Sequence, residues 1–332
     1  MAEPAQQDDP LVSIVIPCFN EEEVLQTTYR RLVETLNPVP QTQFEFVFVD
    51  DGSRDGTLDE LHQLRTADPR IRVLAFSRNF GHQMAVTAGI EHASGDAVVV
   101  IDADLQDPPE VIKEMLTRWR DGAEVAYGVR LERDGETAFK LWSAKAFYRS
   151  INRMSEVTIP LDTGDFRLMD RKVVNALLEM PERDRFLRGM VAWLGFKQEA
   201  VPYRRAARAA GKTKYPLRKM ARFAVDGILS FSLAPLRLAI WLGFGTAAGA
   251  MLAAAYALAI RLAASVWVPG WTLLFIACAG IGGVQLLCLG VVGEYVGRIY
   301  GEAKKRPLYI IRERYGFTST RVPRVRERKA LV

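Results

Sequence analysis

The chain has 332 residues, of which 49% are hydrophobic and 25% charged, and it carries a formal net charge of +5. The length exceeds that of one ordinary domain, and three scattered cysteines with three scattered histidines argue against a disulfide framework or a zinc site. The basic excess argues against a nucleic-acid-binding protein, because it gathers beside the apolar segments and at 321–329, where an anionic membrane surface is the better partner.

Residues 11–215 alternate between short apolar runs and helical segments, the pattern of strand–helix–strand units. The predicted strands lie at 12–16, 44–49, 71–76, 97–101 and 125–128. The predicted helices lie at 20–36, 59–65, 82–92 and 110–119. We therefore predict an α/β domain with a mostly parallel sheet.

The run 98–107 (VVVIDADLQD) places two carboxylates, Asp102 and Asp104, directly after a buried strand. Ligands of open α/β sheets bind at the carboxyl ends of the strands. Carboxylates there cost desolvation energy unless a cation pairs with them, and a hard divalent ion that holds a diphosphate suits oxygen ligands. The alternative is a pair of strand-end or helix-capping aspartates ahead of Pro108.

Two uncharged stretches, 238–260 and 263–293, are each long enough to span a membrane. The second helix is expected to begin near Trp271, after Pro269 and Gly270, so that the turn covers 261–270. Basic residues flank the pair of stretches, whereas the turn holds only Arg261. The positive-inside rule then places both termini and the N-terminal domain in the cytoplasm of an inner-membrane protein. Residues 1–10 are polar and do not resemble a secretory signal.

Apolar and basic residues alternate at near-helical spacing over 216–236, which is typical of an interfacial amphipathic helix. The alternative is a helix packed on the N-terminal domain. The predicted organisation is a polar tail (1–10), an α/β domain (11–215), this helix (216–236), two transmembrane helices (237–297) and a basic cytoplasmic tail (298–332). Small residues such as Gly245 and Gly249 predict helix packing, and a homo-oligomer is expected.

Five motifs, taken in order, resemble family-2 glycosyltransferases that act on polyprenyl phosphate, such as dolichol-phosphate mannose synthases and bacterial bactoprenol glucosyltransferases. The motifs lie at 16–21 (IPCFNE), 50–53 (DDGS), 102–106 (DADLQ), 164–167 (GDFR) and 211–215 (GKTKY). With the two apolar stretches, the resemblance covers 12 to about 317. It implies a GT-A-type fold, a nucleotide-binding α/β domain followed by two transmembrane helices.

The resemblance also implies the residues of the donor site. Asp51 matches the position that binds the nucleotide base, and Pro17, Asn20 and Glu21 line the same cleft. Asp50 is expected to close an Asx-turn before Gly52.

Asp102, Asp104 and Gln106 match the site for Mg²⁺ or Mn²⁺ and the diphosphate, where the ion would neutralise the departing nucleoside diphosphate.

The acceptor half of the site is implied by further matches. Asp165 matches a position often described as catalytic, but a polyprenyl phosphate is largely ionised at pH 7 and needs little help from a base. Asp165 could equally orient Arg130, Arg167 or the acceptor phosphate. Arg130 matches a phosphate-contacting arginine, and Lys214 is expected to bind one of the two substrate phosphates. The alternative for the basic residues is a surface ion pair or a contact with a lipid headgroup.

The function that follows from the resemblance is an inverting, metal-dependent transfer of a hexose from a nucleotide sugar to polyprenyl phosphate at the cytoplasmic membrane face. The product would be a lipid-linked sugar for cell-envelope glycans. UDP-glucose is the leading donor, since 102–110 and 163–169 look closest to the glucosyltransferase branch, and GDP-mannose or other UDP-sugars stay open. A non-catalytic membrane scaffold is the alternative, although Asp102 and Asp104 are both present. A processive synthase would need more membrane spans.

Overall fold

The computed structural model describes residues 9–131, 163–204, 234–264 and 270–317. Lys214 and residues 216–233 of the predicted amphipathic helix lie outside these ranges. The chain forms two compact units. One contains residues from before and after the two long C-terminal helices, and the other contains those helices. Each unit is described by itself.

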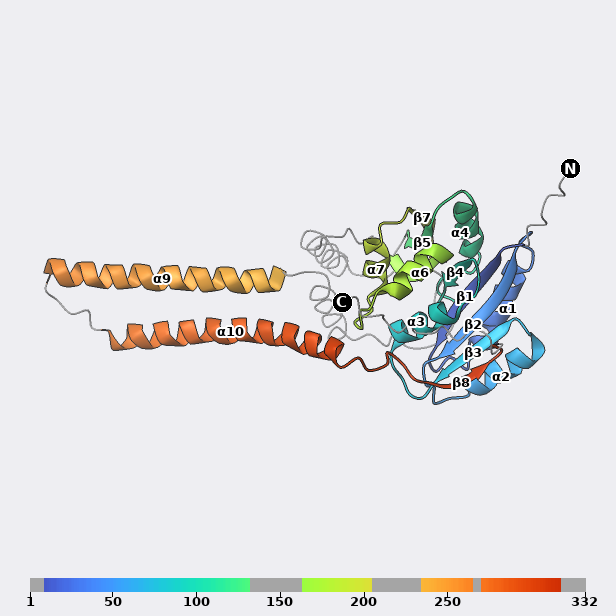
Figure 1. Ribbon diagram of the computed structural model, residues 1–332, viewed down its shortest axis with the longest axis horizontal. Coiled ribbons are helices and arrows are strands. Elements are labelled where there is room, and N and C mark those ends of the chain that lie inside the picture. The colour runs from blue at the N-terminus through green and yellow to red at the C-terminus, as the bar shows by residue number, and fades with distance from the viewer. Residues whose placement is uncertain (1–8, 132–162, 205–233, 265–269, 318–332) are drawn as a thin grey trace, which may run out of the picture. The chain divides into compact units, whose positions relative to one another are not determined.

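In the first unit, eight strands of the described residues form one sheet in the order β7-β5-β6-β4-β1-β2-β3-β8 (Figure 1). The strands are β1 (Leu11–Cys18), β2 (Gln43–Asp50), β3 (Ile71–Phe76), β4 (Ala97–Val100), β5 (Val125–Arg130), β6 (Thr163–Asp170), β7 (Gln198–Tyr203) and β8 (Ile311–Tyr315). The central strands β4, β1, β2 and β3 are parallel. β6 runs antiparallel to β4 and β5, and β8 runs antiparallel to β3. The α/β fold with a mostly parallel sheet is confirmed.

The helices of the first unit cover both faces of this sheet. They are α1 (Leu25–Leu36), α2 (Thr57–Ala67), α3 (His82–His92), α4 (Val111–Arg120), α6 (Arg171–Glu179) and α7 (Leu187–Trp193). Because successive strand residues point to opposite faces, Ile14 and Phe46 join one cluster with Leu32 of α1, Leu61 of α2 and Met115 of α4. Each of these five side chains is fully buried, and such burial stabilises a fold by roughly 1.5–3 kcal/mol per side chain.

α3 lies unusually close to the sheet. A Cβ added at Gly89 would come within 2.2 Å of Val15 Cγ1 on β1, so the helix needs a glycine at this contact. α3 begins at His82, shortly after the carboxyl end of β3, and Gly81 before it has a φ of 104°, which favours glycine. The close packing therefore fixes where the first residues of α3 lie at the carboxyl edge of the sheet.

The structure corrects three boundaries. The helix predicted from 20 begins only at Leu25, because Asn20 and Glu22 bond to the β2–α2 loop at Arg54 and Gly56 instead of continuing the helix. Within the predicted tail 298–332, the second long helix continues to Ala303 and residues 311–315 form β8. β8 was missed because its charged and apolar residues alternate over only five positions.

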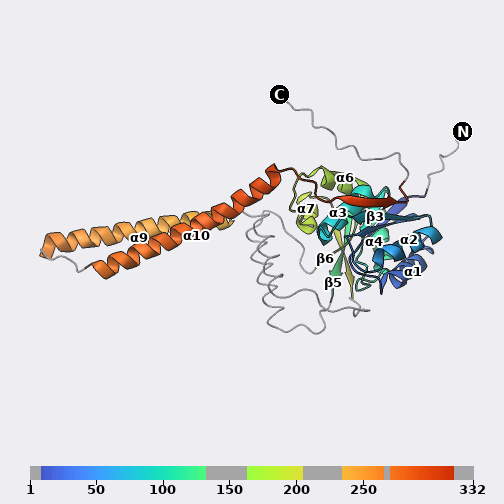
Figure 2. The ribbon, with the colours of Figure 1, turned by 90° about the horizontal axis from the view of Figure 1, so that it is seen from below.

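The second unit contains α9 (Ala234–Ala264) and α10 (Trp271–Ala303), which lie alongside each other (Figure 2). α10 begins at Trp271 as predicted, whereas α9 continues past Arg261 to Ala264, so the predicted turn over 261–270 starts too early. The segments Leu238–Tyr256 and Gly280–Ala303 are long and apolar enough to cross a membrane. Leu252 and Leu286 are more than 70% exposed, as expected of side chains that face lipid.

The predicted packing of Gly245 and Gly249 is not seen between α9 and α10. A Cβ added at either position would meet no described atom within 4 Å. The small residues therefore do not bring the two helices together within one chain, and the homo-oligomer stays a prediction.

Candidate active site

The carboxyl edge of the parallel strands gathers acidic residues from segments far apart in the sequence. β4 pairs with the antiparallel β6 so that Val100 lies opposite Arg167. Asp102 lies two residues after Val100, and Asp165 lies two residues before Arg167. The register of two antiparallel segments thus brings two carboxylates to one edge, which no pattern in either segment predicts by itself.

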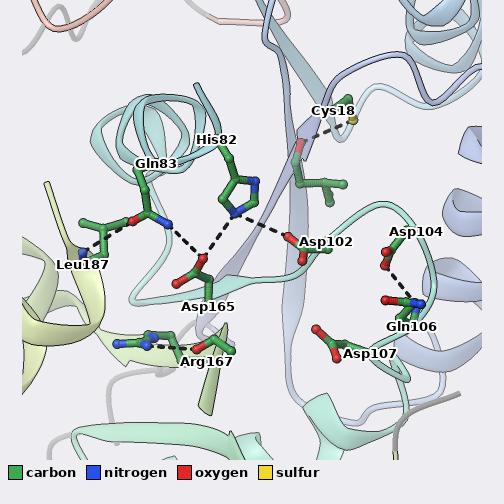
Figure 3. Close-up of polar contacts among 12 residues, drawn as sticks. Cys18, His82, Gln83, Asp102, Asp104, Gln106, Asp107, Asp165, Arg167 and Leu187 are labelled. Carbon is green, nitrogen blue, oxygen red and sulfur yellow. Dashed lines mark hydrogen bonds and ion pairs between the residues drawn. The ribbon is translucent and has the colours of Figure 1, made fainter. Parts of the chain in front are cut away.

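His82, the first residue of α3, lies between these two carboxylates (Figure 3). Its Nε2 is 3.3 Å from Asp165 Oδ2 and 3.6 Å from Asp102 Oδ1. Burial alone would lower the pKa of His82, but the hydrogen bond with Asp165 and the charges of both carboxylates raise it to about 9. His82 is therefore a cation at neutral pH and links β4 to β6.

The Asp165 carboxylate is held from three sides. Its Oδ1 accepts a hydrogen bond from Arg188 Nε of α7 at 2.9 Å, and its Oδ2 accepts one from Gln83 Nε2 at 2.9 Å as well as the contact with His82. Gln83 is itself fixed, because the backbone N of Leu187 donates to its Oε1 at 3.4 Å. The Asp165 side chain is only 9% exposed.

These partners decide the charge of Asp165. Burial alone would raise the pKa of Asp165, but the charge of Arg188 and the hydrogen bonds from His82 and Arg188 hold it well below its ordinary value. By contrast, desolvation raises the pKa of Asp102 to about 6, although the charge of His82 opposes the shift. The pKa values of two carboxylates at one edge are thus shifted in opposite directions, and such shifts are common at functional sites.

The turn after β4 carries side-chain oxygen atoms of the kind that coordinate a hard cation. Leu105 has a φ of 55°, and the turn lets the backbone N of Gln106 donate to Asp104 Oδ1 at 3.1 Å (Figure 3). Gln106 Oε1 is buried and has no hydrogen-bond partner among the described residues. A buried oxygen without a partner costs free energy unless a cation, a water or a ligand reaches it. Asp102, Asp104 and Gln106 therefore fit the predicted metal site.

Within the described ranges, no three His, Cys, Asp or Glu side chains form a metal cage of their own. One or two carboxylates together with substrate phosphates usually hold Mg²⁺ in proteins.

Asp107 belongs to a second polar cluster beside the turn. It is 1% exposed and accepts a hydrogen bond from Tyr203 Oη at 2.5 Å. Arg130 Nη2 lies 3.7 Å from Asp107 Oδ1, and Arg130 Nε donates to Tyr203 Oη at 3.2 Å. A Cβ at Gly164 would come within 2.9 Å of Arg130 Nη2, so this glycine leaves room for the guanidinium one residue before Asp165. The predicted phosphate-contacting arginine is therefore held at the same edge as the carboxylates.

The predicted donor residues lie at the ends of β1 and β2. Asp51 is 3% exposed and accepts hydrogen bonds from the β3–α3 loop: from Phe80 N at 2.7 Å, Gly81 N at 3.0 Å and Asn79 Nδ2 at 2.9 Å. Burial raises the pKa of Asp51, although the hydrogen bonds from Phe80 and Gly81 oppose the shift. Asp51 thus ties the β3–α3 loop to the end of β2.

The loop after β2 is joined to the end of β1. Asn20 N donates to Ser53 Oγ, and Glu21 N donates to Thr57 Oγ1, each at 2.9 Å. Ser53 N donates to Asp50 Oδ1 at 3.0 Å, in agreement with the turn-closing role predicted for Asp50. Pro17 is the last residue but one of β1, so it lies at this edge too.

The direct partners of Asp165 come from α3 and α7, and the described structure shows no ion pair of Asp165 with Arg130 or Arg167, although the charge of Asp165 acts on Arg167. The orienting role of Asp165 stays a prediction. Arg167 is 5% exposed and donates to the Gly164 carbonyl oxygen at 3.1 Å, and burial lowers its pKa to about 10. Asp165 and Arg167 share one face of β6, and the packing of the neighbouring helices selects which groups each one meets.

Sequence reasoning missed His82, Gln83, Arg188, Asp107 and Tyr203. The position of His82 and Gln83 was a usable signal, because they follow the strand 71–76 at the edge where ligands of such sheets bind. Arg188 on α7 and Tyr203 on β7 carry no comparable signal, since both elements follow the predicted strand–helix alternation and lie beyond the last strand predicted from the sequence.

Comparisons with known proteins show the family of the chain. The family model described as Glycosyl transferase family 2 matches residues 13–178. A Bacillus subtilis (strain 168) relative, "Uncharacterized glycosyltransferase YkcC", is 48% identical over 312 residues, which cover 94% of this chain and 96% of the relative. An Escherichia coli (strain K12) relative, "Prophage bactoprenol glucosyl transferase homolog", is 40% identical over 301 residues, which cover 91% and 98%.

Among solved structures, "Mannosyltransferase PcManGT from Pyrobaculum calidifontis in complex with GDP-Man and Mn2+" is similar with a TM-score of 0.45. It is 19% identical, and the match covers 84% of this chain and 87% of that chain. At this distance the likeness says nothing of activity.

Proposed function

The chain belongs to glycosyl transferase family 2, and we propose on this basis that it transfers a hexose from a nucleotide diphosphate sugar to the phosphate of a polyprenyl lipid. The family membership confirms a glycosyltransferase of the GT-A-type fold, as the five motifs predict. UDP-glucose is the proposed donor, Mg²⁺ or Mn²⁺ the proposed cofactor, and the cytoplasmic membrane face the proposed location. The product is a lipid-linked sugar for cell-envelope glycans.

The observation that carries the proposal is the set of oxygens after β4. Asp102, Asp104 and the unpartnered Oε1 of Gln106 are the residues that would hold the divalent ion. When bound, the ion supplies Lewis-acid stabilisation to the departing nucleoside diphosphate. Asp51, with Pro17, Asn20 and Glu21 beside it, would receive the nucleotide at the neighbouring strand ends.

The acceptor side of the proposal depends on Arg130. A planar guanidinium can hold a phosphate through two parallel hydrogen bonds. Asp107 and Tyr203 fix the Arg130 side chain before any substrate arrives, so little conformational entropy is lost when the phosphate binds. Arg167 is buried against Gly164 and would support this part of the site from behind, and Lys214 would add a second cation.

Asp165 fits the role of an anchor better than that of a general base. Three donors already occupy its carboxylate, and its pKa lies well below the usual range, so it has little tendency to take a proton. A polyprenyl phosphate oxygen is ionised near neutral pH and can attack without losing a proton to the enzyme. We propose that Asp165 holds His82 and the start of α3 in position while the sugar is transferred with inversion in one displacement.

The membrane association of the acceptor has its own support. The relatives named bactoprenol glucosyl transferase act, by name, with a lipid acceptor, and this chain carries two helices able to cross a membrane. The positive-inside rule supports a cytoplasmic site. In sealed vesicles, an impermeant nucleotide sugar should label lipid only when the cytoplasmic face is outside; label from the opposite orientation alone would contradict this topology.

A transfer assay tests the function directly. The full-length protein in detergent is incubated with undecaprenyl phosphate, Mg²⁺ or Mn²⁺, and labelled UDP-glucose, GDP-mannose and other UDP-sugars. We expect label from UDP-glucose in the organic phase, lost with EDTA and in Asp104→Asn. Asp121→Asn, at the exposed end of α4, is the matched control and should keep full activity. Label from GDP-mannose alone would show that GDP-mannose is the donor and not UDP-glucose. Transfer without a metal ion would contradict the proposed metal site.

A further inference from the structure

The segment that follows α10 returns to the first unit and lies against the donor side of the site. Residues 307–315, here called the C-terminal strap, end in β8, which pairs with β3 and forms the edge of the sheet (Figure 2). Ser77 N, directly after β3, donates to the Ile310 carbonyl oxygen at 2.9 Å. The strap therefore contacts the beginning of the β3–α3 loop that holds Asp51.

Tyr309 joins the strap to both flanks of that loop. Its ring stacks on Phe76, the last residue of β3, with centroids 5.0 Å apart and an interplanar angle of 14°. Its Oη donates to Glu91 Oε2, near the end of α3, at 2.5 Å. One side chain thus contacts the element before the loop and the helix after it.

The contact continues from Phe76 to Asp51. Phe76 is fully buried and meets the ring of Phe80 edge-on at 5.6 Å. The backbone N of Phe80 donates to Asp51 Oδ1 at 2.7 Å, and that of Gly81 to Oδ2 at 3.0 Å. The chain of contacts Tyr309–Phe76–Phe80–Asp51 fixes the loop by packing at one end and by hydrogen bonds at the other.

α3 is held at both of its ends by the same arrangement. His82 and Gln83 at its start bind Asp165, while Glu91 near its end binds Tyr309. A half-buried contact at the far end of a helix, made of a ring stack on the neighbouring strand and a hydrogen bond, limits how the first turn of the helix can move. The strap therefore contacts the two elements that carry parts of the site: the loop that binds Asp51 and the helix that carries His82.

We propose that the start of the C-terminal strap, residues 309–310, is a structural part of the donor-nucleotide site and that Tyr309 is a positioning residue for the Asn79–Gly81 loop. The inference rests on the proposed function in one respect, the role of Asp51 in nucleotide binding. It gives the segment that follows α10 a role in binding a nucleoside diphosphate. Tyr309 acts through Phe76 and Phe80 and does not itself touch the nucleotide.

The test compares two tyrosines of the same strap in the full-length protein. Tyr309→Leu removes the ring stack and the hydrogen bond, and Tyr309→Phe removes the hydrogen bond alone. Tyr315→Leu is the matched control, because Tyr315 lies on β8 but packs against His62 of α2, away from the loop. The Kd for UDP and for GDP, the KM for the nucleotide sugar and kcat are measured for each.

We expect Tyr309→Leu to raise the nucleotide Kd and the donor KM about tenfold, with kcat changed by less than about twofold. Tyr309→Phe should have a smaller effect in the same direction, and Tyr315→Leu should leave the Kd unchanged. An unchanged Kd in Tyr309→Leu, or an equal loss in Tyr315→Leu, overturns the inference while the proposed function stands. If the wild-type protein binds neither UDP nor GDP, the proposed function fails, and the inference fails with it.

Hydrogen exchange provides a readout that needs no ligand. The amides of Phe80 and Gly81 are bonded to Asp51, so their exchange reports how firmly the loop is held. Tyr309→Leu should speed their exchange by about tenfold, and Tyr315→Leu should not. Unchanged protection of both amides in Tyr309→Leu would overturn the positioning role.

Discussion

Replacing Arg188 by methionine tests whether Asp165 serves as an anchored anion. Arg188 Nε donates to Asp165 Oδ1 at 2.9 Å, and the two side chains are 23% and 9% exposed. Removing one partner of a buried ion pair costs about 3–5 kcal/mol, and a hydrogen bond to a charged group contributes about 1.5–3 kcal/mol. Since Gln83 and His82 still hold the carboxylate, we expect a loss of about 2 kcal/mol.

The double variant Asp165→Asn/Arg188→Met separates the two roles of Asp165. If Asp165 is an anchor, the neutral amide leaves no unpaired charge, and the double variant should be more stable and more active than Arg188→Met alone. We expect Arg188→Met to lower kcat about 30-fold, which is the equivalent of about 2 kcal/mol, and the double variant to recover about tenfold of it. If Asp165 is the base, the double variant recovers nothing.

The assay is lipid-linked label formation at saturating donor, together with the thermal unfolding midpoint of each variant. A loss of about 2 kcal/mol corresponds to a fall of roughly 4–8 °C in a unit of this size. Arg118→Met is the control, because its pair with Glu114 has a similar distance of 2.9 Å but is exposed and should contribute less than about 1 kcal/mol. A double variant no better than Arg188→Met would refute the anchoring role.

Three further outcomes are expected. Gln106→Leu should not lower the unfolding midpoint of the metal-free protein, since Oε1 loses no described partner, but should raise the Mn²⁺ concentration for half-maximal activity about tenfold; an unchanged metal requirement would contradict the ligand role. Tyr203→Phe removes the hydrogen bonds that fix Arg130 and should raise the acceptor KM about tenfold with the donor KM unchanged. Burial alone would raise the pKa of Asp68, but hydrogen bonds from Arg70 and Tyr29 lower it to about 2 from 3.8. Asp68→Asn should therefore lower stability by about 2 kcal/mol at pH 7, a difference that shrinks as the pH falls from about 4 to about 2; a constant difference across that range in thermal unfolding would disprove the linkage.

Features that depend on short stretches of chain were predictable from the sequence. Strand–helix alternation placed the parallel strands within a few residues, because the hydrophobic pattern of each element follows from its own geometry. The start of the second long helix at Trp271 followed from Pro269 and Gly270 in the same way. The carboxylates Asp102 and Asp104 were located at a strand end because such ends are where these sheets bind ligands.

The partners of those carboxylates were decided by tertiary structure alone. Asp165 and Arg167 are two residues apart on β6 and share one face, so the sequence suggested that they act together. The antiparallel register with β4 and the close approach of α3 bring His82 to Asp165 instead, and α7 brings Arg188. The contacts of Asp165 join residues 82 positions apart with Gln83 and 23 positions apart with Arg188, and they depend on packing, which no local pattern encodes.

The same limit explains why the sequence predicts a basic tail over 298–332, where the structure has the C-terminal strap. Its five-residue strand has no strong pattern of its own and becomes a strand because the edge of β3 offers unpaired backbone groups to it. The sequence by itself determined the α/β domain, the two apolar helices and the acidic strand end. Only the folded chain decided that a segment from beyond the two apolar helices completes the sheet and contacts the loop around Asp51, because long-range pairing is selected by the shape of the partner.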